Sequence, residues 1–423
     1  MNVLVIGSGA RENAFIWKLR HDNDRITNLF TLPGNAGTAQ LAIPGVPMDD
    51  FPRIAQAAID HNVNMIVVGP EVPLVAGLRN FFDADSRLKS IHFIGPGQDG
   101  AILEGSKCFA KDFMQRHHIP TAASLTVSAA NLHQGLDFLT TLTPPYVLKA
   151  DGLAAGKGVV IPTTLHDAQT ELKAMLAGKF GKAGATVVIE EFLHGEEASF
   201  FILTDGNHYK ILPNAKDYKR IGDDNTGPNT GGMGAISPVP FVDESFAKKV
   251  EERIIIPTVT GLLAEGITYK GFLYFGLMNV DGNPFLIEYN CRMGDPEAAV
   301  VIPRIKSSLT DLFEGVALGD LHMRNLQIDH RAAATIVLAS EGYPNAYETG
   351  KAITGLDTLP PDALVFHAGT TLQQNTHHVL TNGGRVLAVG AFGTNVPDAL
   401  QHAYALVPQI HFEGKYFRHD IGS

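Results

Sequence analysis

Three polar side chains in the second half of the chain have the spacing of a metal and phosphate site. Glu288, Asn290 and Arg292 occupy alternate positions of a predicted strand, so they are expected to share one face. The other face is predicted to carry Ile287, Tyr289 and Cys291. A carboxylate beside an amide oxygen provides hard ligands suited to Mg²⁺, and an arginine next to them could hold a transferring phosphoryl group. The alternative is an edge strand with a polar outer face.

A second candidate site is the glycine-rich turn within Tyr146–Ile161, which is flanked by two short apolar strands. Its glycines and lysines are Lys149, Gly152, Gly156, Lys157 and Gly158. The glycines allow the backbone to approach a ligand closely, and the lysines and free N–H groups could bind a polyphosphate. The spacing is not that of a P-loop, which needs four residues between its glycines and a Ser or Thr after the lysine. The alternative is an ordinary hairpin with two exposed lysines.

Two further segments could complete a nucleotide site. The periodicity of Glu104–Arg116 predicts a helix with Ser106 near its start, and Lys107 in the first turn opposes the helix dipole unless a phosphate lies there. The predicted strand Thr186–Glu190 runs into an acidic turn whose backbone could pair with an adenine edge, and Glu197 beyond it could accept ribose hydroxyls. The alternatives are an exposed lysine and a solvated acidic surface.

The elements that must position these groups begin with an alternating strand and helix region, residues 1 to about 95. Its strands are expected at Val3–Ile6, Leu29–Leu32, Met65–Val68 and Ile91–Ile94. Such a series predicts a parallel sheet with right-handed crossovers, and ligands of these sheets bind at the carboxyl ends of the strands.

The first turn of this region partly matches a dinucleotide-binding fingerprint. Gly7 and Gly9 have the right spacing, but Glu12 stands where the third glycine belongs, and no acidic residue follows the second strand. An NAD-dependent dehydrogenase is therefore kept only as a rival enzyme class. A helix N-terminus that holds a single phosphate, with Arg11 alongside, is the other interpretation.

The rest of the chain is predicted to hold a hairpin, a long loop and a third region. The hairpin strands Phe272–Met278 and Pro284–Cys291 are expected to turn at Asp281-Gly282. Residues 213–238 are rich in glycine and basic residues, which predicts a functional loop that acts as a lid. Residues 325–423 show no catalytic cluster and are expected to support the others. Their predicted strands and helix are Ala332–Leu338, Ala363–His367, His378–Leu380, Arg385–Gly390 and Val396–Val407.

The bulk composition excludes several function classes. A formal net charge of −11 argues against a nucleic-acid surface. Cys108 and Cys291 are the only cysteines and lie far apart, which indicates a reduced, cytoplasmic protein, and the 17 histidines form no zinc motif. The N-terminal MNVLVIG is a strand and not a signal peptide, and no apolar run approaches the ~18 residues of a membrane helix. Small-molecule substrates are expected, with no nucleic-acid or membrane partner; the chain could be a monomer or a dimer.

Several longer segments follow one another in a fixed order. They are VLVIGSGARENA, PGNAGTA, VGPEVPLVAGL, LEGSKCFAKDF, KADGLAAGKGV, VIEEFLHGEEASF, GPNTGGMGAISP and LIEYNCRMGDPE. In this order they resemble the phosphoribosylamine–glycine ligase family of the ATP-grasp superfamily, over essentially the whole chain to FRHDIGS. The resemblance implies an α/β ATP-grasp fold. Residues 1–103 would form a Rossmann-like domain, 104–324 the ATP-grasp domain with a glycine-loop subdomain at about 121–192, and 325–423 a small α+β domain.

The resemblance also implies a reaction and a set of site residues. ATP phosphorylates the glycine carboxylate, and the amine of 5-phosphoribosylamine displaces phosphate to form an amide. The residues implied at ATP are Lys107, Lys149, Gly152, Gly156, Lys157, Gly158, Glu190, Glu191, Phe192, Leu193 and Glu197. Those implied at the other substrate are Gly9, Arg11, Asn35, Glu71 and Asp295. Glu288 and Asn290 would bind Mg²⁺ or Mn²⁺, and the implied catalytic residues are Arg292, Lys219 and Asp217.

Three segments depart from the usual family motifs GGREHA, QDHK and GDPETQ. The departures are Ala10, Asn13, Lys216, Tyr218, Ala298 and Ala299. Hydrogen-bonding groups lost from a substrate site can change specificity by large factors. The departures are therefore either tolerated changes behind the site or the mark of a paralogue that joins a different carboxylate or amine. A nucleotide-binding protein without turnover is a further alternative, against which the intact Glu288, Asn290 and Arg292 argue.

Overall fold

The amino-terminal region is a parallel sheet covered by helices, as predicted. The computed structural model describes residues 1–22, 25–153, 158–373, 376 and 378–423. The sheet has the order β2-β1-β3-β4, with all described pairs parallel. Its strands are β1 (Asn2–Gly7), β2 (Asn28–Pro33), β3 (Met65–Val68) and β4 (His92–Ile94). Its helices are α1 (Ala10–His21), α2 (Phe51–Asp60), α3 (Glu71–Val75), α4 (Leu78–Ala84) and α5 (Gln98–Gly105). The predicted strand runs Val3–Ile6 and Met65–Val68 are buried throughout, whereas Leu29, Phe30 and Ile91 of the two outer strand runs are partly exposed.

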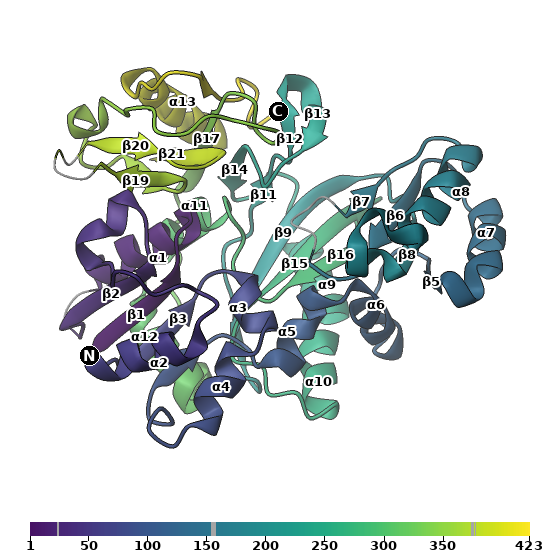
Figure 1. Ribbon diagram of the computed structural model, residues 1–423, viewed down its shortest axis with the longest axis horizontal. Coiled ribbons are helices and arrows are strands. Elements are labelled where there is room, and N and C mark those ends of the chain that lie inside the picture. Colours follow the sequence, from purple (N-terminus) through teal and green to yellow (C-terminus); the bar gives the residue numbers. More distant parts are fainter. Residues whose placement is uncertain (23–24, 154–157, 374–375, 377) are drawn as a thin grey trace.

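A separate lobe carries the predicted glycine-rich turn and projects from one end of the molecule (Figure 1). Its antiparallel sheet has the order β5-β8-β6-β7. The elements are β5 (Ser124–Ser128), α7 (Leu132–Thr141), β6 (Tyr146–Ala150), β7 (Val159–Val160), α8 (Leu165–Ala174) and β8 (Thr186–Glu191). The lobe has a hydrophobic core of its own, formed by the inner faces of this sheet and its two helices.

A second antiparallel sheet, β10-β9-β15-β16, forms the centre of the molecule. Its strands are β9 (Glu196–Thr204), β10 (Tyr209–Ile211), β15 (Gly271–Val280) and β16 (Asn283–Asn290). The helices beside it are α6 (Lys107–Arg116), α9 (Glu244–Val250), α10 (Ile256–Ala264) and α12 (Leu309–Leu318), whereas the short helix α11 (Ala298–Val301) packs against α1. The predicted hairpin is confirmed, and both turn residues, Asp281 and Gly282, have the positive φ that such a turn requires.

Two local predictions for this region were wrong. The expected helix Glu104–Arg116 is broken at Ser106, whose extended backbone ends α5 and whose hydroxyl caps α6 by accepting a hydrogen bond from the Phe109 N–H. On β16, a register shift opposite Gly276 and Leu277 adds one residue to the strand. Ile287 therefore lines the same cleft as Glu288, although strict alternation placed it on the opposite face.

The predicted long loop at residues 213–238 is instead built from short strands. They are β11 (Lys216–Asp217), β12 (Arg220–Gly222), β13 (Thr226–Asn229) and β14 (Gly234–Ser237). β12 and β13 form a hairpin, whereas β11 and β14 extend the sheet of the carboxyl-terminal region in the order β11-β14-β17-β21-β18. The prediction failed because the partner of β14 is β17, which lies far along the chain, and no local pattern records that pairing.

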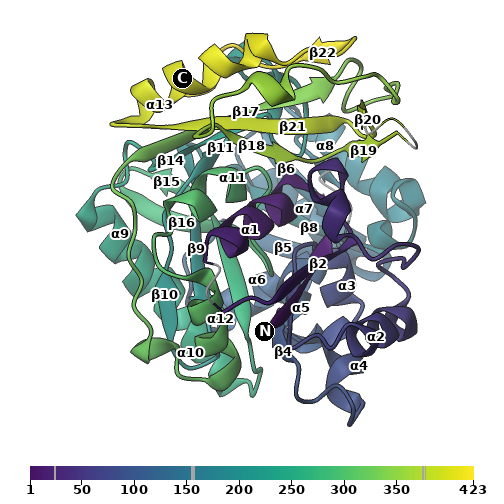
Figure 2. The same ribbon diagram turned by 90° about the vertical axis from the view of Figure 1, so that its left-hand side faces the viewer.

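The carboxyl-terminal sheet lies across α1 of the amino-terminal region (Figure 2). Its remaining elements are β17 (Ala332–Ser340), β18 (Leu364–His367), β21 (Arg385–Gly393), β22 (Lys415–Tyr416), α13 (Val396–Leu406) and the pair β19 (Thr370–Leu372) and β20 (Val379–Thr381). Across the described ranges, no helix has the length and apolar character needed to cross a membrane.

Candidate active site

A cleft of about 920 Å³ lies where the three regions meet the lobe. Its walls come from the amino-terminal region, the lobe, the central sheet, the segment 216–231 and the start of β21. All the predicted site residues that the structure describes line this cleft, apart from Gly9 and Asn35. Gly156 and Lys157 lie outside the described residues.

Three lysines line the cleft beside the glycine-rich turn of the lobe. Lys107 Nζ donates to the Gly152 carbonyl at 2.9 Å, so it lies beside the glycine-rich turn. Burial lowers the pKa of Lys107; the Glu288 charge opposes this effect and the Lys149 charge adds to it. Glu190 is buried and forms ion pairs with Lys149 at 3.0 Å and with Lys111 at 3.2 Å. The Glu190 carboxylate is therefore engaged by lysines, while its backbone stays at the cleft wall.

Lys111 was missed by the sequence interpretation, although it stands one helical turn after Lys107 on α6. Its Nζ also donates to Thr121 Oγ1 at 2.6 Å, and Thr121 Oγ1 in turn donates to the Leu286 carbonyl of β16 at 2.6 Å. This chain of contacts joins α6, the start of the lobe and the central sheet. Burial lowers the pKa of Lys111 to about 8, against the opposing charge of Glu190.

Carboxylates gather on the opposite wall of the cleft. The pKa of Asp217 is raised to about 7: burial is the main cause, the Lys219 charge opposes it, and the charges of Glu297, Glu197 and Glu288 add to it. Lys219 pairs with Glu197 at 2.5 Å. Although burial by itself lowers the pKa of Lys219, the charges of Glu197 and Asp217 hold it well above its ordinary value. The cluster has an excess of negative charge that a cation would relieve.

The residues predicted to bind metal fit Mg²⁺ by their chemistry. Glu288 and Asn290 both line the cleft, at the end of β16. Among the described residues, no group of three or more His, Cys, Asp or Glu side chains is arranged to hold a metal. Mg²⁺ is commonly bound by one or two carboxylates together with substrate phosphates and waters, without an all-protein cage. A carboxylate, an amide and a bound polyphosphate would match that pattern.

Arg292 is held between two carboxylates of the amino-terminal half. Its Nη2 donates to Glu104 at 2.7 Å and its Nε to Glu71 at 3.2 Å. Burial raises the pKa of Glu104, whereas the charges of Arg292 and Arg11 outweigh burial and lower the pKa of Glu71. Glu104 was missed by the sequence interpretation because α5, on which it lies, is far from Arg292 along the chain.

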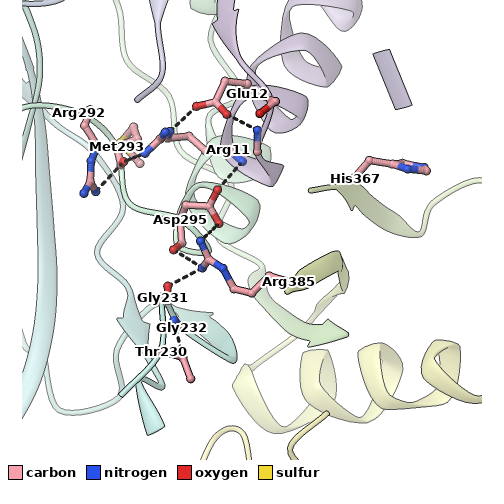
Figure 3. A network of polar contacts seen from close by, with 12 residues as sticks. Arg11, Glu12, Thr230, Gly231, Gly232, Arg292, Met293, Asp295, His367 and Arg385 are labelled. Carbon is pink, nitrogen blue, oxygen red and sulfur yellow. Dashed lines mark hydrogen bonds and ion pairs between the residues drawn. The ribbon is translucent and has the colours of Figure 1, made fainter. Parts of the chain in front are cut away.

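At the start of α1, amide groups predicted to bind a phosphate are already bonded to carboxylates (Figure 3). The Gly9 N–H donates to Glu12 at 2.6 Å, and the Arg11 N–H donates to Asp295 at 3.3 Å. The Arg11 side chain donates to Glu12 and to the Met293 carbonyl. The Glu12 side chain fills the space beside Gly7, where a dinucleotide pyrophosphate would approach, so the dehydrogenase alternative finds no support here.

Asn35 is buried behind the cleft and joins two regions. Its Nδ2 donates to the carbonyls of Ser8 at 2.9 Å and His367 at 2.7 Å, and its Oδ1 accepts from the Gly37 N–H at 3.0 Å. Burial lowers the pKa of His367 to about 4. Asn13, one of the departures from the family motifs, accepts the His367 N–H at 2.7 Å. These contacts fasten β18 of the carboxyl-terminal region to the amino-terminal strand ends.

Arg385, at the start of β21, also lines the cleft, although the carboxyl-terminal region was expected only to support the others. Its Nη1 donates to the carbonyls of Gly231 and Asp295, and its Nη2 lies 3.2 Å from Asp295 Oδ1 (Figure 3). No spacing pattern points to Arg385, because its partners come from segments far earlier in the chain.

A lobe bearing a glycine-rich turn, set against a central antiparallel sheet with a carboxylate and an amide at its edge, defines an ATP-grasp protein. Models of the three phosphoribosylglycinamide synthetase domains match successive parts of the chain: the N domain at residues 1–104, the ATP-grasp (A) domain at 105–298 and the C domain at 333–423. The chain belongs to the phosphoribosylglycinamide synthetase family.

Full-length relatives agree with this assignment. Proteins named phosphoribosylamine–glycine ligase from Vibrio cholerae and Escherichia coli are 45% and 46% identical to the chain, and the matches cover 100% of this chain and 98% of each relative. A crystal structure of phosphoribosylamine–glycine ligase from Thermotoga maritima matches with a TM-score of 0.84 at 34% identity, over 99% of this chain and 100% of that one. The chain is therefore an ATP-dependent, ADP-forming ligase.

Proposed function

We propose that the chain joins glycine to 5-phosphoribosylamine at the expense of ATP, giving glycinamide ribonucleotide, ADP and phosphate, as a step of purine biosynthesis in the cytoplasm. The observation that carries the assignment of the site is the meeting of two sets of residues in one cleft. Lys107 and Lys149 line it together with Glu288 and Asn290, and the charges of Lys149 and Glu288 both act on the pKa of Lys107. Cations for a polyphosphate and oxygen ligands for a divalent metal are thus held side by side.

In this proposal ATP lies between the lobe and the central sheet. Lys107, Lys149 and the described glycines Gly152 and Gly158 bind its phosphates. The backbone of Glu190–Leu193, where β8 leaves the lobe, binds the adenine edge, and Glu197 accepts the ribose hydroxyls. Gly156 and Lys157 would add to the phosphate contacts.

Glu288 and Asn290 would hold Mg²⁺ or Mn²⁺, which neutralises charge on the ATP phosphates during transfer. The γ-phosphoryl group passes to a glycine carboxylate oxygen, forming glycyl phosphate and ADP. Arg292 and Lys219 stabilise the charge that develops in this step. Their own ion pairs with Glu104 and Glu197 fix them in place before substrates arrive.

The second step joins the amine of phosphoribosylamine to the glycyl carbon and releases inorganic phosphate, and the amine loses a proton. Asp217, whose pKa of about 7 suits proton transfer near neutral pH, is proposed to accept that proton. Arg11, Glu71 and Asp295 form the wall on the acceptor side. Gly9 and Asn35 act from behind this wall by holding α1 and the loop after β2.

The experiment that tests the proposal is ADP release by the purified protein with Mg-ATP, glycine and freshly generated phosphoribosylamine, omitting each in turn. Turnover that requires all three supports the proposed substrates. ATP binding without turnover would instead indicate a different carboxylate or amine, and a screen of other amino acids and amines would follow.

A further inference from the structure

Arg385 joins the carboxyl-terminal region to two segments of the active site. It lies 154 residues after Gly231 and 90 residues after Asp295, yet its guanidinium bonds the carbonyls of both at 2.5 and 2.7 Å. A third contact, at 3.2 Å, reaches the Asp295 carboxylate. A guanidinium provides several donors in a fixed plane, so one side chain can hold two backbone segments and a carboxylate together, whereas the three donors of a lysine lie on one atom and do not match this planar arrangement.

The first segment that Arg385 holds is continuous with the proposed catalytic lysine. Thr230 donates through its N–H and its hydroxyl to the Lys219 carbonyl, at 2.7 and 2.8 Å. At Gly231, the carbonyl is bonded by Arg385 and the N–H donates to the Tyr343 hydroxyl at 3.0 Å. Both backbone groups of Gly231 are therefore held by side chains of the carboxyl-terminal region, and through Thr230 they fix the backbone of Lys219.

The second segment is the acceptor-side wall. One oxygen of Asp295 faces Arg385 while the other accepts the Arg11 N–H at the start of α1. Although burial raises the pKa of Asp295, the charges of Arg385 and Arg11 outweigh it and keep the carboxylate ionised. Figure 3 shows Arg385 between Gly231 and Asp295, at the junction of the three regions.

We propose that Arg385 is a positioning residue for the acceptor side of the active site, which it organises by fixing the Gly231 backbone and the Asp295 carboxylate at once. The inference rests on the proposed function, because it assigns Asp295 and Lys219 to the site where glycine and phosphoribosylamine react. It predicts that loss of Arg385 impairs the use of these two substrates and leaves ATP binding intact, since the described contacts of Arg385 are with Gly231 and Asp295, neither of which is assigned to ATP.

Two independent substitutions displace the guanidinium. Arg385→Met removes it, whereas Gly231→Ala pushes it away, because an added Cβ would lie 2.8 Å from the Arg385 Cζ. Gly231 is not among the positive-φ glycines, so alanine suits its backbone. Each variant is expected to raise the KM for glycine and phosphoribosylamine and to lower kcat, by about 10- to 100-fold in kcat/KM, while the Kd for ATP measured by calorimetry changes less than about twofold. In the double variant the effects should not add, because with methionine at 385 the added methyl group displaces no guanidinium.

A readout that does not depend on turnover separates this inference from the proposed function. Hydrogen–deuterium exchange at the Thr230 and Gly232 amides should quicken in Arg385→Met and in Gly231→Ala relative to the parent protein. Arg385→Lys should restore only a part of the protection. Arg331→Met is the control, since among the described residues the half-exposed Arg331 side chain pairs with Asp329 and lies over Phe392 of β21, the strand that also carries Arg385.

The inference is overturned if the effects of Arg385→Met and Gly231→Ala simply add, if ATP affinity falls in step with the other substrates, or if exchange at residues 230–232 is unchanged. Failure of the parent protein to turn over glycine would count against the proposed substrates alone, because the exchange measurement would still report whether Arg385 fixes this segment.

Discussion

The carboxylate of Glu104 holds both the side chain of Arg292 and the backbone N–H of Cys291, the residue before it. Oε1 accepts a hydrogen bond from Arg292 Nη2 at 2.7 Å, and Oε2 accepts the N–H of the preceding residue, Cys291, at 2.8 Å. Arg292 lies two residues beyond Asn290, the last residue of β16, where the strand ladder no longer determines its position. The buried Glu104 carboxylate on α5 therefore holds this segment in position, as hydrogen bonds to a neighbouring strand would within a sheet.

Glu104→Ala is expected to lower kcat by about 100-fold and the free energy of unfolding by about 1–3 kcal/mol, because Arg292 loses its shorter ion pair and the Cys291 N–H loses its partner. Steady-state kinetics and urea denaturation measure the two effects. The matched control is Glu265→Ala, which removes a two-bonded ion pair with Arg116 at the surface and should cost less than about 1 kcal/mol with normal kcat. Equal behaviour of the two variants would mean that Glu104 has no special role.

Glu288→Ala should abolish ADP release while the protein keeps its fold, because Glu288 lines the cleft and contributes little to the core. The variant should have the circular dichroism spectrum and unfolding midpoint of the parent. A chelator should have the same effect on the parent protein, reversed by added Mg²⁺ or Mn²⁺. Near-normal turnover in a folded Glu288→Ala protein would contradict its assignment as a metal ligand.

Lys111 is predicted to make stability rise with pH in the alkaline range. Burial lowers the pKa of its ammonium group to about 8, whereas in the unfolded chain it remains near 10.5. Between these values the unfolded state binds more protons than the folded state, so the free energy of unfolding increases with pH, by about 1.5 kcal/mol between pH 8 and 9.5. Urea denaturation at pH 7.5, 8.5 and 9.5 measures the slope.

Lys111→Met should remove this contribution and flatten the profile, because the ionising group is gone. Lys173→Met is the control, since Lys173 lies on α8 of the lobe and makes no ion pair among the described residues. A slope that persists unchanged in Lys111→Met would assign the effect to another group. Above pH 8 Lys111 loses its charge, and Lys149 alone then neutralises the Glu190 carboxylate. ATP binding should therefore also weaken, because Lys149 is the lysine proposed to bind the ATP phosphates.

The fold was largely predictable because its strands are apolar runs bounded by turn residues. Met65–Val68 is an example, and Asp281-Gly282 marked the central hairpin because both positions favour positive φ. Lys107, Lys149, Gly152, Gly158 and the polar end of β16 all line the cleft, and local spacing had singled them out. Strands β11 and β14 were missed because each is too short for a periodic pattern and pairs with a distant partner.

The part of the site that was not predicted consists of residues whose partners lie far away along the chain. Glu104, Lys111 and Arg385 touch their partners from other elements, and their types alone match ordinary surface charges. Ile287 was misplaced because a single extra residue in a strand changes which face later side chains take. Such features depend on how distant segments pack, which one sequence does not record.

The last prediction concerns Ala298 and Ala299, where the family motif has threonine and glutamine. Both alanines are the first residues of α11 and are buried in the core, at 0% and 1% exposure, and neither lines the cleft. Introducing Thr at 298 and Gln at 299 into this core should lower the free energy of unfolding by about 1–3 kcal/mol for each position, through overpacking and an unpaired buried amide. Glycine turnover should not rise. Asn13→His, made in parallel, should weaken the docking of β18 by removing the acceptor of the His367 N–H. If instead the variant with both Ala298→Thr and Ala299→Gln keeps its stability and uses glycine faster than the parent, positions 298 and 299 set specificity, and the parent protein acts on a different substrate pair.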